Sequence, residues 1–359
     1  MGLPSISIEF KSAGISAIQR GERGIVALIL DEPNVKGLYR IVTIDDIPEG
    51  IREDNVRYIK DAMIGYVNPA REVKAYFADI SGGDMTLAEV LKELELVKFD
   101  YLAMPEADDE FRTDSSDIAL QIKTWRDNMN KKVKAVLFNT ASDYEGVINL
   151  TTEWFLVNGE QIEGKKYTPR IAGLLAGTPL QISATFAPLP EVENVPAYTR
   201  AELDEKINRG EFVCFHDGEK VKVGRAVNSL VTTTQDKPDD WKKCKIVDIL
   251  DLWHTDITRT AEDNYLGKYA NSYDNKILLL MAISGYNDQL EMDTILARGL
   301  NSVEIDVEAQ RAYLKGKGVD VESMSEQEIK EYDTDDKVFI LATLKPLDAI
   351  EEIKIRAFI

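Results

Sequence analysis

The sequence predicts an α/β unit followed by an α+β unit, with an extended strand at each end of the chain. Segments typical of strands and of helices alternate between Ile25 and Asn139, and this order indicates a layered unit around a mainly parallel sheet. A proline-rich segment, Pro188–Pro196, follows and favours a domain boundary. Both chain ends alternate apolar and polar residues with a period of two, which is the pattern of a half-buried strand.

The first 22 residues are expected to form an N-terminal arm and its linker. In the segment Ser5–Lys11, one face is apolar and holds Ile6, Ile8 and Phe10, because side chains two residues apart in a strand point the same way. The segment Ser12–Gly24 is rich in Gly and Ser and carries charge, so we expect it to be a flexible link.

Residues 23–189 are expected to form the α/β unit. The run Ile25–Leu30 is continuously apolar, as in parallel strands that are covered on both faces. Thr86, with Glu89 three residues later, matches a capping box at the start of a helix. Segments 146–155 and 170–175 are expected to complete the unit. The expected strands are Ile25–Leu30, Glu72–Ala78, Phe99–Met104 and Lys132–Asn139, and the expected helices are Asp54–Val67, Thr86–Val97 and Ser115–Asn130.

Residues 190–345 are expected to form the second, α+β unit. Thr199 is a suitable N-cap for a helix that Gly210 ends, and Asp217-Gly218 between alternating runs is a strong β-hairpin signal. The expected helices are Thr199–Arg209, Trp241–Tyr269, Asn275–Gly299 and Val307–Gly316, and the expected strands are Phe212–His216, Lys220–Val223, Asn301–Val307 and one at the end of Glu331–Thr343.

Residues 346–359 are expected to form a C-terminal arm, which Pro346 separates from the body. Chain ends fray unless something holds them, so each terminal strand is expected to pair with a sheet. The residues alone leave open whether that sheet belongs to the same molecule or to another. The apolar face of this arm consists of Ile353, Ile355, Ala357 and Ile359.

Composition and charge argue against several classes of protein. An apolar fraction of 44% and a charged fraction of 30% are typical of a folded globular protein. The net charge of −20 argues against general binding to nucleic acid or to an anionic membrane, both of which need clustered Lys and Arg. No apolar run reaches membrane-spanning length, and no secretory signal begins the sequence. We therefore expect a protein made in the cytoplasm, in which Cys214 and Cys244 are buried thiols rather than a disulfide.

The motifs of common enzymes and cofactor sites are absent from the sequence. Only two histidines, His216 and His254, are present to serve a catalytic triad, and no G-x-S-x-G elbow accompanies them. Neither C-x-x-C nor H-E-x-x-H occurs, and GEKVKVG at 218–224 does not match a phosphate-binding loop. The acidic turn DTDD at 333–336 lacks the glycine and the closing glutamate of an EF-hand. We therefore expect no catalytic, metal-binding or cofactor-binding residues.

Six stretches, spread over nearly the whole chain, carry a resemblance to a known family: GERGIVALIL at 21–30, YTPRIAGLLAGTPLQISATFAPL at 167–189, VKVGRAVNSLVTT at 221–233, WKKCKIVDILDLWHTDIT at 241–258, YLGKYAN at 265–271 and KPLDAIEEIKIRAFI at 345–359. In this order they resemble the sheath proteins of contractile phage tails and of phage-tail-like bacteriocins, in the compact form of Gram-positive systems. The large outward-facing insertions of bigger sheath proteins have no counterpart in this sequence.

The resemblance implies a structural protein and not an enzyme. In the family, the α/β unit is similar to a subtilisin-type sheet without catalytic residues, and the C-terminal unit faces the tail tube. The arms of two neighbours add strands to a sheet in a third subunit. The residues of these inter-subunit arms would be Ile6, Ile8, Phe10, Ile353, Ile355, Ala357 and Ile359.

The resemblance also implies an assembly and its partners. Family members polymerise as a helix of stacked rings around the tube, and contraction drives the tube through the target cell envelope. The implied partners are further copies of the chain, the tail tube protein, and baseplate and tail terminator proteins. They meet in a virion or bacteriocin particle, with no nucleic acid bound and no insertion of the sheath into a membrane.

Two other functions remain open at this point. A cytoplasmic α/β enzyme acting on a small molecule would have its site at the carboxyl ends of the sheet strands, with both chain ends paired inside the molecule. A baseplate component would assemble into a closed ring instead of an open helix.

Overall fold

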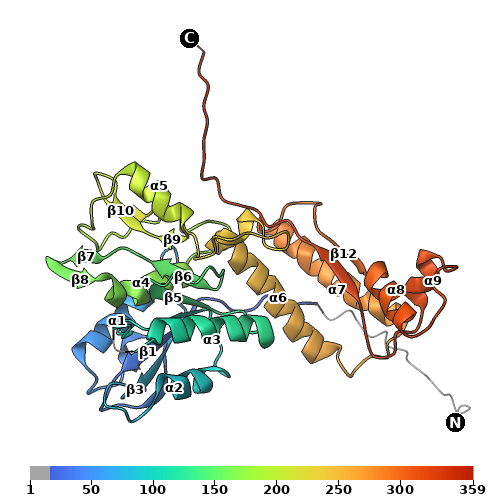
Figure 1. The fold of residues 1–359 in the computed structure, drawn as a ribbon, viewed down its shortest axis with the longest axis horizontal. Coiled ribbons are helices and arrows are strands. Elements are labelled where there is room, and N and C mark those ends of the chain that lie inside the picture. Colours follow the sequence, from blue (N-terminus) through green and yellow to red (C-terminus); the bar gives the residue numbers. More distant parts are fainter. Residues whose placement is uncertain (1–16, 111, 359) are drawn as a thin grey trace, which may run out of the picture. The chain divides into compact units, whose positions relative to one another are not determined.

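The computed structural model describes residues 17–110 and 112–358, and the chain divides into two compact units (Figure 1). The larger one, the sheet unit, comprises Gly21–Thr255 and the C-terminal segment from Pro346. The smaller one, the helix unit, comprises Asp256–Lys345 and the segment that ends at Arg20. Helix α6 (Cys244–Asn264) contributes residues to both.

The sheet unit is built on a seven-stranded sheet with the order β2-β3-β1-β4-β5-β6-β9. All neighbouring pairs are parallel except β2 with β3. The predicted, mainly parallel sheet is therefore confirmed. The antiparallel edge strand β2 was missed, because its sequence GLYRI does not alternate. The strands are β1 (Ile25–Asp31), β2 (Gly37–Ile41), β3 (Glu72–Ala78), β4 (Tyr101–Ala103), β5 (Lys134–Phe138), β6 (Val147–Leu150) and β9 (Glu211–Phe212).

Helices cover both faces of this sheet, as the apolar run in β1 predicts. Alternate residues of β1 lie in two different cores. Val26, Leu28 and Leu30 face α1 (Glu53–Ile64) and α4 (Thr168–Ala176). The intervening residues Ile25, Ala27 and Ile29 lie in the core that includes α2 (Leu87–Leu94) and α3 (Asp114–Asn128). A strand whose two faces are both buried has no position left for a polar side chain.

Local capping residues set several helix boundaries. Thr86 accepts a hydrogen bond from the Glu89 N–H at 3.3 Å, and the Glu89 carboxylate accepts one from the Thr86 N–H at 2.8 Å. This confirms the predicted capping box. Helix α1 ends at Ile64, earlier than predicted, because Gly65 adopts a φ of +70°, which favours glycine.

The proline-rich segment Pro188–Pro196 does not divide the compact units, although it was the expected boundary between residues 23–189 and 190–345. Beyond it, β9 pairs in parallel with β6 and so extends the same sheet. The division lies between Thr255 and Asp256, inside α6. The sequence did not indicate that the sheet continues beyond Pro196, because β9 is only two residues long and has no measurable period.

The rest of the sheet unit consists of smaller elements. The predicted helix capped by Thr199 and the predicted hairpin around Asp217-Gly218 are both present. These elements are η1 (Ile44–Asp46), η2 (Gly164–Tyr167), α5 (Arg200–Asn208), η3 (Asp239–Lys242) and the antiparallel pairs β7 (Trp154–Val157) with β8 (Glu160–Glu163) and β10 (Cys214–His216) with β11 (Val221–Val223).

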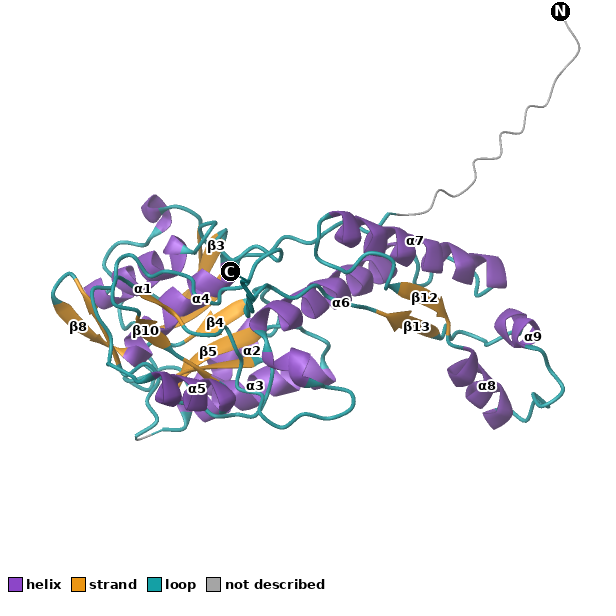
Figure 2. Cartoon of the chain, turned by 90° about the horizontal axis from the view of Figure 1, so that it is seen from above, coloured by secondary structure: helices purple, strands orange, loops and turns teal. Residues whose placement is uncertain are grey.

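The helix unit contains a long helix beside a two-stranded antiparallel sheet. Figure 2 shows β12 (Ser302–Ile305) and β13 (Ile340–Thr343) next to α7 (Tyr273–Met292). Two short helices, α8 (Val307–Gly316) and α9 (Glu326–Glu331), surround a small core of Leu314, Val321 and Ile329. Helix α9 had not been predicted. No helix in the described part of the chain has both the length and the apolarity needed to cross a bilayer.

Candidate functional site

The sheet places the carboxyl ends of β1 and β4 side by side, at the point where an α/β sheet usually binds a ligand. From β1 the chain continues to β3 on one side, and from β3 it returns to β4 on the other side. Such a reversal opens a crevice beyond the strand ends. Asp31 is the last residue of β1, Glu32 follows it, and Glu106 follows β4. An enzyme of this fold would have its site at this crevice.

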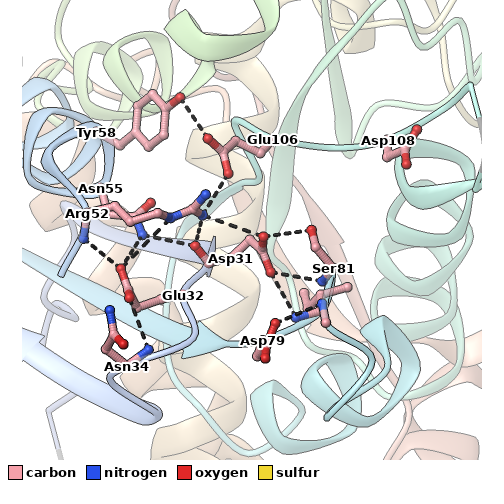
Figure 3. Close-up of polar contacts among 12 residues, drawn as sticks. Asp31, Glu32, Asn34, Arg52, Asn55, Tyr58, Asp79, Ser81, Glu106 and Asp108 are labelled. Carbon is pink, nitrogen blue, oxygen red and sulfur yellow. Dashed lines mark hydrogen bonds and ion pairs between the residues drawn. The ribbon is translucent and has the colours of Figure 1, made fainter.

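Side chains of the protein itself occupy this crevice (Figure 3). The Arg52 guanidinium contacts the Glu106 carboxylate at 2.9 Å and donates to the Asp31 carbonyl. The Arg52 N–H donates to Glu32 at 2.7 Å, and Asn55 donates to the same carboxylate oxygen at 3.0 Å. Glu32 is completely buried. The central position between the two strands is thus taken by an arginine and its partners.

The electrostatics of the crevice keep Asp31 and Glu32 ionised. Burial alone would raise the pKa of Asp31, but hydrogen bonds from Ser81 and Ile80 and the nearby Arg52 hold that pKa below its usual value. The pKa of Glu32 is lowered in the same way, against the effect of burial, by hydrogen bonds from Arg52, Asn34 and Asn55. A general base at neutral pH needs a pKa close to 7, so these carboxylates act as hydrogen-bond acceptors and ion-pair partners.

A cavity of about 420 Å³ shares Glu106 with the crevice. Acidic residues of the loop after β4 line one part of it, and Lys165 and Lys166 line another. Asp108, one of these acidic residues, lies apart from the Arg52 network in Figure 3. Among the residues that the structure describes, no three His, Cys, Asp or Glu side chains gather as a metal site.

The histidines and cysteines named from the sequence do not come together. His216 is exposed in the β10–β11 hairpin, where its Nδ1 accepts a hydrogen bond from the Gly218 N–H at 3.0 Å. His254 lies half-buried in α6. Cys214 and Cys244 are free, buried thiols, as predicted, and burial raises the pKa of Cys214 to about 12.

A buried ionic cluster at the amino ends of β4 and β5 was not predicted. Lys134 of β5 contacts Asp248 at 2.9 Å and Asp251 at 2.7 Å, both on α6. Tyr101 of β4 donates to Asp248 at 2.9 Å, and Arg126 contacts Asp251 at 2.8 Å. The first turns of α6 are therefore tied to the sheet by charge pairs. The signal for this cluster in the sequence is a pair of aspartates one turn apart in the largely apolar helix segment WKKCKIVDILDLWH. The segment does not show which basic residues pair with them.

The linker expected to be flexible is attached to the sheet unit over its last residues. Arg23 contacts Asp248 at 2.9 Å and is mostly buried. The N–H groups of Gly24 and Ile25 both donate to Asp100, at 2.7 and 2.9 Å. The prediction of a flexible link over Ser12–Gly24 is therefore wrong for its last residues, because Arg23 finds a buried partner far away in the sequence.

The C-terminal arm has an attached root and an exposed end. Ile353 is 76% exposed, Ile355 is 84% exposed, and Phe358 is 95% exposed. Ala357 is also exposed, and no residue from Leu347 to Phe358 belongs to a strand. In Figure 1 the red C-terminal trace likewise has no strand arrow. The other predicted arm residues, Ile6, Ile8, Phe10 and Ile359, lie outside the described residues.

The β12–β13 pair is a sheet whose outer edges carry no further strand from the described part of the chain. Within the described strands, β12 and β13 pair only with each other. By contrast, isolated bridges cover one edge of each hairpin in the sheet unit, at Leu156 with Asn194 and at Lys222 with Pro188.

Comparison with known proteins identifies the family. The phage tail sheath protein central domain matches residues 78–229, and the phage tail sheath C-terminal domain matches residues 236–359. A tail sheath protein of Clostridium phage phiCD119 is 39% identical over 361 residues, which is 99% of each chain. The chain belongs to the phage tail sheath protein family.

Solved structures show the same fold at low sequence identity. The sheath tail protein from Desulfitobacterium hafniense is 20% identical and has a TM-score of 0.68, over 84% of this chain and 94% of that one. A chain of the PVC sheath complex, an extracellular contractile injection system in its contracted state, is 12% identical and has a TM-score of 0.67. That match covers 100% of this chain and 98% of the other.

Proposed function

We propose that this protein is the structural subunit of a contractile tail sheath. It polymerises helically around a tail tube, and its contraction drives the tube through the envelope of a target cell. Its partners are other copies of itself, the tube protein, and the baseplate and terminator proteins at the two ends of the tail. It is made in the bacterial cytoplasm, functions in the assembled particle and catalyses no reaction. Family membership and the likeness to a sheath complex support this proposal.

The exposed C-terminal arm is the single observation that favours assembly by strand donation most strongly. Ile353 and Ile355 alternate with Lys354 and Arg356, yet all four side chains are exposed. Alternation with a period of two separates a buried face from a solvent-exposed face. It would stabilise nothing in a segment that remains fully exposed to solvent. The buried face therefore forms when the arm pairs with another copy, the mode known as strand addition.

The β12–β13 sheet of another copy is the acceptor in this proposal. A two-stranded sheet is at best marginally stable alone, and added strands would complete it. Its inward face includes Val303 and Ile305, while Glu304 lies on the exposed face. An arm paired here with its isoleucines inward would place Lys354 and Arg356 on the same face as Glu304. Opposite charges on neighbouring strands stabilise such a pairing.

One arm in one contact would bind weakly. Burying Ile353 and Ile355 stabilises the contact by roughly 1.5–3 kcal/mol each, and each new hydrogen bond adds about 1 kcal/mol. Ordering the backbone costs roughly 1–2 kcal/mol per residue, so these terms nearly cancel. Because each subunit would both donate and accept arms, a lattice would hold many such contacts at once. Free subunits would then stay soluble until a tube starts the assembly.

The enzyme alternative loses its main support in the crevice between β1 and β4. Arg52, Glu32 and Glu106 bind one another at the strand ends where a small molecule would bind, although a cavity remains beside Glu106. Saturable binding of a metabolite by a monodisperse monomer would favour the enzyme over the sheath subunit.

Electron microscopy of the protein expressed with its tail tube protein tests the proposal. We expect hollow helical sheaths on the tubes, and their absence at high protein concentration would count against it. Closed rings without helical growth would indicate a baseplate component. Deletion of Glu352–Ile359 should leave a folded monomer that forms no sheath. Sheaths that still form after this deletion would refute donation of the C-terminal strand.

A further inference from the structure

The root of the C-terminal arm is held by a compact set of polar contacts. The Glu351 carboxylate accepts a hydrogen bond from the Thr185 hydroxyl at 2.6 Å and contacts the Arg225 guanidinium at 2.8 Å. The Ser183 hydroxyl donates to the same carboxylate at 3.3 Å. The Glu351 side chain is only 10% exposed, although Ile350 beside it is 87% exposed. The chain is thus fixed at Glu351, directly before its exposed end.

The residues that hold Glu351 are themselves fixed to the start of α6. The Thr185 hydroxyl accepts a hydrogen bond from the Ala226 N–H at 3.1 Å. The Cys244 N–H, at the first residue of α6, donates to the Ala226 carbonyl at 3.1 Å. Lys243, one residue earlier, pairs with Asp348 of the arm root. The arm root therefore rests on the first turn of a helix that the buried ionic cluster ties to the sheet.

The segment leading from the N-terminus is fixed to the same helix. Arg23 contacts Asp248, which lies one turn beyond Cys244. Pulling this mostly buried guanidinium away is costly, because Asp248 would lose one of the two positive charges that balance it in the buried cluster. Arg23 and the root of the C-terminal arm are thus held at or next to the first turns of α6.

We propose that Glu351, held by Arg225 and Thr185, is the fixed point of the C-terminal arm and determines which residues are free to pair with another copy. This inference rests on the proposed function. With the clamp closed, the free arm is Glu352–Ile359, eight residues that span at most about 26–29 Å. If the arm were free from Pro346, fourteen residues would span about 46–50 Å.

The fixed point has two physical consequences for assembly. A shorter free arm reaches fewer acceptor positions, so the clamp selects the neighbour that receives it. It also sets the register of the new strand, because a slip by one residue would turn Ile353 and Ile355 to the solvent face. Tension on the arm would pass through Glu351 into α6 and the sheet, and the segment 346–350 would not stretch.

A spin label on the arm root measures the clamp in the soluble protein, without any need for assembly. The label is placed at Ile350→Cys, and the native cysteines do not compete because both are buried. In Glu351→Ala we expect the rotational correlation time of the label to fall by about twofold or more, as for release of an ordered loop. The matched control is Glu352→Ala, whose carboxylate is 71% exposed and contacts Arg225 only at 3.4 Å. It should leave the label unchanged.

Assembly on tubes provides the second measurement. Glu351→Ala should raise the critical concentration for sheath formation by about tenfold, and Glu352→Ala should not. The exchange Arg225→Glu with Glu351→Arg should restore both the label's immobility and assembly.

The outcomes separate this inference from the proposed function. Equal label mobility in Glu351→Ala and the parent protein would overturn the clamp, even if sheaths form. A mobile label with unchanged assembly would overturn its role in selecting the acceptor. Failure of the parent protein to form sheaths, with the label mobility changed as expected, would overturn the proposed function and leave the clamp standing.

Discussion

The substitution Ile355→Ala tests the proposed strand donation at a single side chain. Ile355 is 84% exposed in the free subunit, so nearly all of its surface remains available for burial in a neighbour. Surface substitutions usually change stability by less than about 0.5 kcal/mol. We therefore expect the thermal unfolding midpoint of the soluble subunit to stay the same.

Assembly should respond quite differently to the same change. Ile→Ala in a packed core costs about 2–5 kcal/mol, and about 1.4 kcal/mol corresponds to a factor of ten. Even a loss of about 2 kcal/mol per contact raises the critical concentration for sheath formation roughly 30-fold. Sedimentation of sheath at a series of subunit concentrations, with tubes present, measures this.

Lys354→Ala is the matched control, because Lys354 lies on the opposite face of the same arm. An exposed ion pair contributes at most about 1 kcal/mol, so this variant should assemble at nearly the parent concentration. If the two variants shift assembly equally, the arm does not bury one face. If Ile355→Ala lowers the unfolding midpoint, the residue packs within its own subunit and the reasoning fails.

Further predictions concern the sheet unit and are checked by urea denaturation. Burial, only partly opposed by nearby arginines, raises the pKa of Asp61 to about 6. Its ionisation therefore destabilises the fold as pH rises from about 4 to 6, and Asp61→Asn should gain stability at pH 8 but not at pH 4. Asp251 behaves oppositely. Burial would raise its pKa, but its basic partners hold that pKa at about 2. It therefore contributes roughly 2–3 kcal/mol above about pH 4 that is lost as pH falls toward 2, and Asp251→Asn should flatten this acid dependence. Thr86→Ala removes a helix cap and should cost about 0.5–2 kcal/mol, whereas Thr86→Ser should cost little. Gly173→Ala would place a Cβ 2.1 Å from the Ala62 carbonyl oxygen and should cost about 1–3 kcal/mol; unchanged stability would contradict the close approach of α4 to α1.

The parts of the fold predicted from sequence are those whose signal lies within a single element. The strand Glu72–Ala78 and the helix Val307–Gly316 have the predicted bounds, because their periods and caps involve only neighbouring residues. The strand β2 was missed because it is an edge strand with three exposed residues in five. Its place depends on pairing with β3 and not on its own pattern.

The sequence by itself determined the alternating strands and helices, the acidic character of the chain and the two-faced pattern of its C-terminal arm. The acidic character follows from composition alone. The other two follow from the spacing of neighbouring side chains, which the backbone geometry of a helix or strand converts into faces. Only the tertiary structure decided that Arg52 fills the crevice, that Arg23 meets Asp248 and that Glu351 meets Arg225. Such pairs join residues far apart in the chain, and an exposed charge and a buried, paired one look the same in a sequence. Their partners are set by the order of the strands in the sheet, since that order brings distant loops and helix ends together.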